Sequence, residues 1–139
     1  MSFKASVTAV MLVVLGIVYG WYFAQVLIEA GSTPVADIAY QDLLLVMVAI
    51  LVVLSIIGVA IVAVLRRRES GQEDERDKVI EMRGDQVGSY VLAVAALAAM
   101  GLAMLEGEYF WIAHVLLAGL VLSEMAKAVV MLLAYRRGF

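Results

Sequence analysis

The chain has 139 residues, of which 65% are hydrophobic, whereas soluble domains average about 45–50% apolar residues. Its mean hydropathy of +1.00 argues against a soluble domain, and its mild net charge of −3 argues against nucleic-acid binding, which needs a basic patch. The absence of cysteine excludes disulfides, thiolate metal sites and cysteine nucleophiles.

Four apolar segments, at about residues 5–28, 43–65, 87–105 and 109–135, dominate the chain. Each reaches the roughly 17–25 residues with which a helix crosses the hydrocarbon core of a bilayer. These segments should be helices, because lipid offers no hydrogen-bond partners and a helix satisfies its backbone polar groups internally. The first segment exceeds the apolar core of a secretory signal, and no clear cleavage site follows it. The sequence therefore predicts a single all-α transmembrane domain over 1–139, an integral membrane four-helix bundle.

The basic residues predict its orientation. Nine of the ten Lys and Arg residues precede the first span, follow the last span or lie between spans 2 and 3, and the other two connections contain none. The positive-inside rule assigns the basic side to the cytoplasm. We therefore expect a multi-pass protein with both termini cytoplasmic.

The connection over residues 66–86 is the only sizeable polar segment. Ser70 and Glu73 have the spacing of a capping box. They predict a short amphipathic helix from about Gly71, at the cytoplasmic membrane surface, which either continues into span 3 or breaks near Gly84.

The segment DERDKVIEMRGDQVGSYVL resembles the inner segment of small bacterial four-span proteins of unknown function, which carry a D-E-R-D-x-x-I stretch before their third span. The matching residues are Asp74, Glu75, Arg76, Asp77 and Ile80, continuing to Arg83 and Gly84. The resemblance implies a protein of the bacterial cytoplasmic (inner) membrane and brings no known substrate or active site.

Two charged residues, Glu124 and Lys127, interrupt the last span near its middle. Their spacing of three places them on one helix face. Because a charge at the centre of a span costs about 2.5–3.5 kcal/mol, we expect the two to form an intramembrane polar pair. Two interpretations stay open: an ion or proton relay, and a structural ion pair that determines helix packing.

The first span offers partners for this pair. Tyr19, Tyr22 and Gln25 fall on one broad helical face, together with Thr8. We therefore expect spans 1 and 4 to face each other, with Tyr19 or Tyr22 within hydrogen-bond range of the pair. Gln25 and Ser123 are further possible partners.

Small residues at a spacing of four let membrane helices approach closely. Such pairs are Gly16–Gly20, Gly84–Gly88 and Gly119–Ser123. Together with the two polar-lined spans, they predict a homo-oligomer, a dimer or larger, and leave room for another membrane protein as a partner.

No other residue pattern points to a reaction. His114 could ligate haem or a metal or act as a pH switch, but no second ligand is evident, which favours a structural role. No nucleophile–base set, phosphate-binding loop or metal-spaced cluster is present, so we expect no enzyme, cofactor, metal or nucleic acid. The sequence favours a non-enzymatic interaction or accessory protein that forms a homo-oligomer, and the alternative is a small oligomeric ion- or proton-coupled transporter or channel that uses Glu124.

Overall fold

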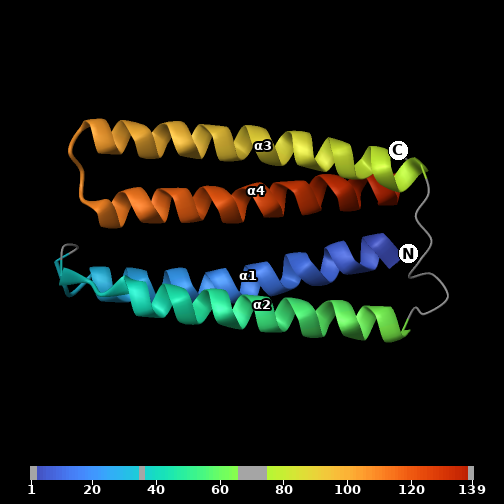
Figure 1. Ribbon diagram of the computed structural model, residues 1–139, viewed down its shortest axis with the longest axis horizontal. Coiled ribbons are helices and arrows are strands. Elements are labelled where there is room, and N and C mark those ends of the chain that lie inside the picture. Colours follow the sequence, from blue (N-terminus) through green and yellow to red (C-terminus); the bar gives the residue numbers. More distant parts are fainter. Residues whose placement is uncertain (1–2, 35–36, 66–74, 138–139) are drawn as a thin grey trace.

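The computed structural model describes residues 3–34, 37–65 and 75–137, and four long helices account for most of them (Figure 1). The helices are α1 (Phe3–Ala30), α2 (Tyr40–Leu65), α3 (Glu75–Met104) and α4 (Tyr109–Arg137). Each is long and apolar enough to cross a membrane. The expected all-α architecture with four candidate spans is confirmed.

The connection between α3 and α4 is a tight turn. The amide of Gly107 donates to the carbonyl of Leu102 at 2.9 Å, and the amide of Glu106 donates to that of Ala103 at 3.1 Å. This pair of bonds is the Schellman pattern, in which the residue after the helix adopts a left-handed conformation. Glu106 has that conformation, with φ of 57°. The turn folds α4 back along α3.

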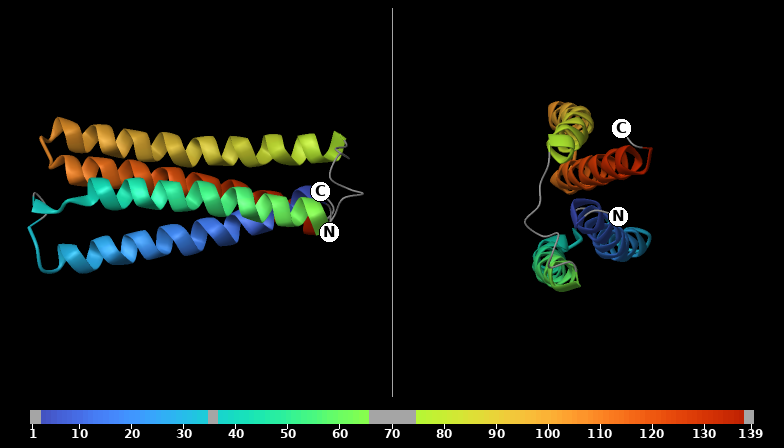
Figure 2. Two further views of the ribbon diagram at one scale, coloured as in Figure 1. Left: turned by 60° about the horizontal axis from the view of Figure 1, so that its bottom comes forward. Right: turned by 90° about the vertical axis from the view of Figure 1, so that its right-hand side faces the viewer.

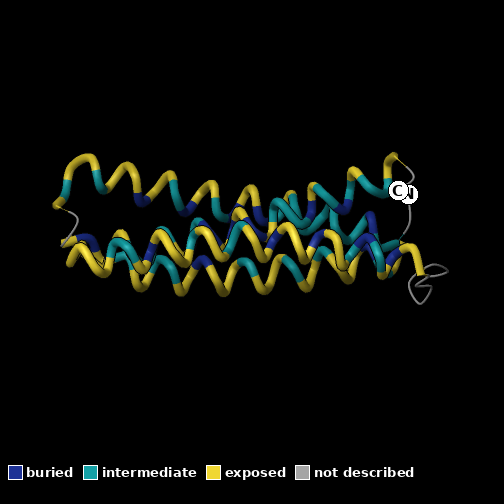
Figure 3. Tube along the Cα trace, turned by 90° about the horizontal axis from the view of Figure 1, so that it is seen from above, coloured by how far each residue is buried: buried dark blue, intermediate teal, exposed yellow. Residues whose placement is uncertain are grey.

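The four helices are arranged as a row, α3–α4–α1–α2. The helix pairs that pack closely are α3 with α4, α4 with α1, and α1 with α2, and the end-on view shows α2 and α3 at the two edges (Figure 2). A buried cluster joins α1, α2 and α4 and comprises Val18, Tyr22, Val26, Ile38, Met47, Phe110 and Leu117. The outward surfaces are largely exposed (Figure 3) and carry many apolar side chains, as lipid contact requires.

The helices run side by side, so the bundle has two ends along the helix axes (Figure 1). Both described ends of the chain lie at one of them, which we call the terminal end. The opposite one, with the turn at 105–108, is the loop end. The terminal end also holds the start of α3. Two termini at the same end are what an even number of spans produces.

Of the two paths expected for the polar segment before span 3, the structure has the one in which the helix continues into the span. Within the described residues it is not a separate surface helix, because Glu75 to Val87 form the first turns of α3, which passes Gly84 without a break. This segment continues the helix because Asp77, Ile80 and Gly84 are buried at helical spacing. Residues 66–74, with the expected capping box, lie outside the described residues.

Candidate functional site: a polar cleft between α1, α3 and α4

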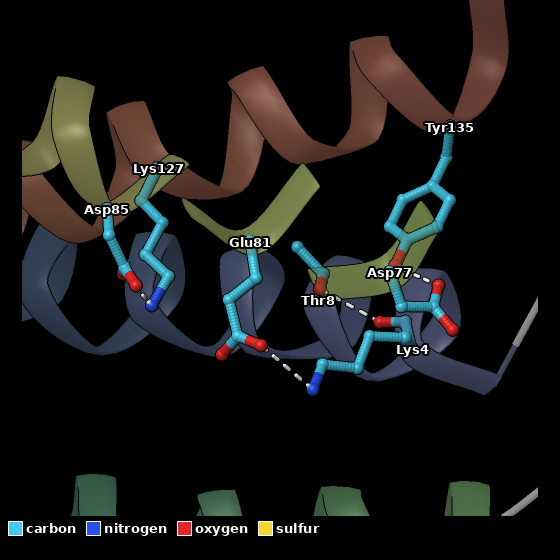
Figure 4. Close-up of polar contacts among 7 residues, drawn as sticks. All are labelled: Lys4, Thr8, Asp77, Glu81, Asp85, Lys127 and Tyr135. Atoms are coloured by element: carbon cyan, nitrogen blue, oxygen red, sulfur yellow. Dashed lines mark hydrogen bonds and ion pairs between the residues drawn. The ribbon is translucent and has the colours of Figure 1, made fainter. Parts of the chain in front are cut away.

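The terminal-end halves of α3 and α4 are joined by polar contacts. Ser123 Oγ donates to the carbonyl oxygen of Gly88 at 2.8 Å, and Tyr135 Oη donates to Asp77 Oδ1 at 2.5 Å (Figure 4). The guanidinium of Arg76 donates to the carbonyl oxygen of Tyr135 at 3.2 Å. Two residues of the D-E-R-D-x-x-I segment, Arg76 and Asp77, therefore help to hold α3 against α4.

Glycine makes this close approach possible. A Cβ on Gly84 would come within 2.9 Å of Met131 Cγ and 3.2 Å of the Lys127 carbonyl oxygen, and a Cβ on Gly88 within 3.1 Å of the Ser123 carbonyl oxygen. The pair at Gly84 and Gly88 is therefore a packing seam within the chain, as its spacing allows.

Lys127 forms its ion pair across this seam. Its Nζ lies 2.5 Å from Asp85 Oδ1 on α3 (Figure 4). The sequence analysis did not name Asp85 as a partner of Lys127, because the helix predicted before span 3 was placed at the membrane surface and not against span 4. The available signal was the spacing of Asp77, Glu81 and Asp85, which recur every four residues and so share one face of a helix that continues into the span.

A second ion pair connects α1 to α3. Lys4 Nζ lies 3.2 Å from Glu81 Oε2, and both side chains are about one-third exposed, at 32% and 37%. Thr8 Oγ1 donates to the Lys4 carbonyl oxygen at 2.8 Å. These groups form a polar rim near the terminal end (Figure 4).

Between the rim and the middle of α4 lies a cleft of about 210 Å³. Its polar lining consists of Lys4, Thr8, Glu81, Glu124 and Lys127. Since Lys4 pairs with Glu81 and Lys127 with Asp85, Glu124 is the acidic residue of this lining that has no ion-pair partner among the described residues.

Glu124 differs from the other acids of the cleft. In the ranges that the structure describes, its carboxylate has neither an ion pair within 4.0 Å nor a hydrogen bond. It is exposed and lines the same cleft as Lys127. The direct pairing of Glu124 with Lys127 stays a prediction; the structure places both in one cleft and gives Lys127 a different nearest partner.

The possible partners on α1 take separate positions. As expected, α1 packs against α4. The hydroxyl of Tyr22, however, lies 2.8 Å from His114 Nε2. His114 precedes Glu124 by ten residues, which is about 15 Å along the helix. Tyr19 lines a neighbouring groove, to which Glu124 does not contribute. Gln25 is exposed on the surface of α1.

His114 sits in the buried cluster near the loop end. Its Nδ1 lies 2.7 Å from the carbonyl oxygen of Phe110, which can only accept, so Nδ1 carries the hydrogen. In the neutral ring, Nε2 then accepts from the hydroxyl of Tyr22. The rings of Phe110 and Tyr40 pack on the imidazole at centroid distances of 4.1 and 5.0 Å. Both ring nitrogens are engaged, which fits the structural role expected for His114.

Among the described residues, no group of three or more His, Asp or Glu side chains could hold a metal ion. Comparison of the chain with protein-family models, with curated proteins and with solved structures gives no match. The chain is a polytopic membrane protein with four long apolar helices and a charged cleft.

Proposed function

We propose that this protein is a small ion- or proton-coupled membrane transporter or channel, in which Glu124 binds a proton or a small cation within the cleft. The observation that carries the proposal is the position of the Glu124 carboxylate. It lies about midway along a candidate span, on the wall of the cleft, without a hydrogen bond or ion pair among the described residues. A charge at that depth is costly in a bilayer, and binding a proton or a cation removes most of that cost.

The orientation follows the positive-inside rule. With the termini in the cytoplasm, the rim formed by Lys4 and Glu81 lies at the cytoplasmic side, and a proton or cation enters the cleft from there. The bacterial cytoplasmic membrane is the location implied by the resemblance of the segment that begins at Asp74. The proposed activity is binding and translocation, and it includes no covalent step.

An interaction or accessory function is the second candidate. It is supported by the open row, since α2 and α3 each pack closely on one neighbour only and expose large apolar side chains. A homo-oligomer would cover part of these edges. In this case Glu124 would contact a neighbouring subunit and would not exchange with water.

The test is carbodiimide labelling of Glu124 in proteoliposomes across pH, with mass spectrometry to locate the adduct. Glu124→Gln measures background, and Glu108→Gln is the matched control because Glu108 is an exposed carboxylate outside the helices. We expect labelling at Glu124 that varies with pH and is reduced by cations, together with ion-coupled proton flux that Glu124→Gln abolishes and Glu108→Gln retains. An adduct absent at every pH at which the protein stays folded would contradict the proposal and favour the accessory function.

A further inference from the structure

A second hollow lies beside the cleft. It is a groove of about 390 Å³ between α1 residues 15–23 and α4 residues 118–125. Small-molecule sites typically occupy about 300–1,000 Å³ and are mainly apolar, with a few polar groups. The groove has that size, and Tyr19 contributes the hydroxyl group in an otherwise apolar lining.

Two glycines create the hollow on the α1 side. A Cβ built on Gly16 or on Gly20 meets no atom within 4 Å. Within the described residues, Gly16 and Gly20 therefore do not lie in a close helix contact, although their spacing predicted one. Gly84 and Gly88 do lie in such a contact. What the glycines leave is space along α1.

The groove and the cleft meet at Leu15, which lines both. Glu124 lines the cleft, and the next residue, Met125, lines the groove. The two adjoining hollows are together called the composite site: an apolar groove toward the loop end and a cleft with Glu124 toward the terminal end, with Leu15 in the lining of both.

We infer that this composite site binds an amphiphilic organic cation, with its charged head at Glu124 and its apolar part in the groove. The inference rests on the proposed function and names the class of cation. Charge selects this ligand: both lysines of the cleft already pair with acids, so an anionic headgroup would meet the charge of Glu124. A neutral chain would fill the groove without any contribution from the carboxylate.

The experiment measures binding to the full chain in nanodiscs by calorimetry, with empty nanodiscs as the reference. The probe is (4-phenylbutyl)trimethylammonium, compared with the sulfonate and the neutral alcohol of the same length. We expect saturable binding of the cation, with the two analogues and Glu124→Gln weaker by about tenfold or more.

A glycine substitution tests the groove without disturbing the fold. Gly20→Val places its side chain in open space and fills part of the groove, so we expect about tenfold weaker cation binding. The matched control is Gly101→Val on α3, which also meets no atom within 4 Å and does not line the groove. This control should bind like the wild type.

Three results would overturn the inference. The first is equal binding of the cation and the sulfonate. The second is wild-type affinity in Gly20→Val. The third is a change in the mass of the Gly20→Val particle, which would make the groove a seam between subunits. Glu124 labelling separates this inference from the proposed function: pH-dependent labelling without cation binding overturns only the choice of ligand, whereas absent labelling overturns the proposed function itself.

Discussion

The closest approach of α3 to α4 can be tested at Gly119. A Cβ built on Gly119 would overlap the Cβ of Ala95 and lie 3.6 Å from the Ala95 Cα. Non-bonded carbons approach each other to about 3.5–4.0 Å, and neither alanine Cβ can rotate away, so Gly119→Ala must push the two helices apart. Overpacking costs about 1–3 kcal/mol, and we expect about 2–3 kcal/mol because backbone has to move. Alanine returns about 1 kcal/mol of helix propensity, which leaves a net destabilisation of about 1–2 kcal/mol.

The assay is unfolding by sodium dodecyl sulfate in mixed micelles, followed by helical circular dichroism. Gly101→Ala is the matched control, because a Cβ there meets no atom within 4 Å; it should be neutral or stabilising. Ala95→Gly should restore most of the stability lost in Gly119→Ala, and the double-mutant cycle isolates this pairwise contact. If Gly119→Ala unfolds at the same point as Gly101→Ala, or if Ala95→Gly gives no recovery, the proposed close approach is wrong.

Three further outcomes are expected. Tyr22→Phe removes the donor to a buried imidazole nitrogen and should cost about 1–3 kcal/mol in the same unfolding assay; an unchanged midpoint would contradict this hydrogen bond. Asp85→Asn removes the ion-pair partner of Lys127, so Lys127 should turn to Glu124 and suppress carbodiimide labelling there, whereas unchanged labelling would show that Asp85 does not hold Lys127 away. A cysteine in place of Gly107 should react with an impermeant maleimide in intact cells, while one near the C-terminus should react only after permeabilisation; the reverse pattern would refute the orientation.

The spans could be predicted from the sequence because hydrophobicity acts on each segment separately. The beginning of α3 could not be placed by the same rule. The residues from Glu75 to Gln86 are largely polar, and their helical path depends on contacts such as Asp77 with Tyr135 and Asp85 with Lys127. A polar segment that packs beside a span looks like a loop when the hydropathy of the chain is considered alone.

Two residues of the cleft were singled out from the sequence. Glu124 and Lys127 were found because charges in an apolar segment are rare, and they do line one cleft. Their surroundings were not predictable, since Asp85 and Glu81 reach the cleft from α3 and Lys4 reaches it from the start of α1.

The sequence by itself determined two features: the four apolar helices, and the placement of nearly all basic residues on one side of them. Both follow from rules that apply to each segment regardless of its neighbours, namely the length of the hydrocarbon core and the cost of burying charge. Tertiary structure alone decided that Lys127 pairs with Asp85, that Tyr22 bonds to His114, and that Gly20 borders an open groove while Gly88 lies in a packed seam. These outcomes depend on the register of helices that are distant in sequence. A shift of one residue along a helix turns a side chain by about 100° and so changes its partner.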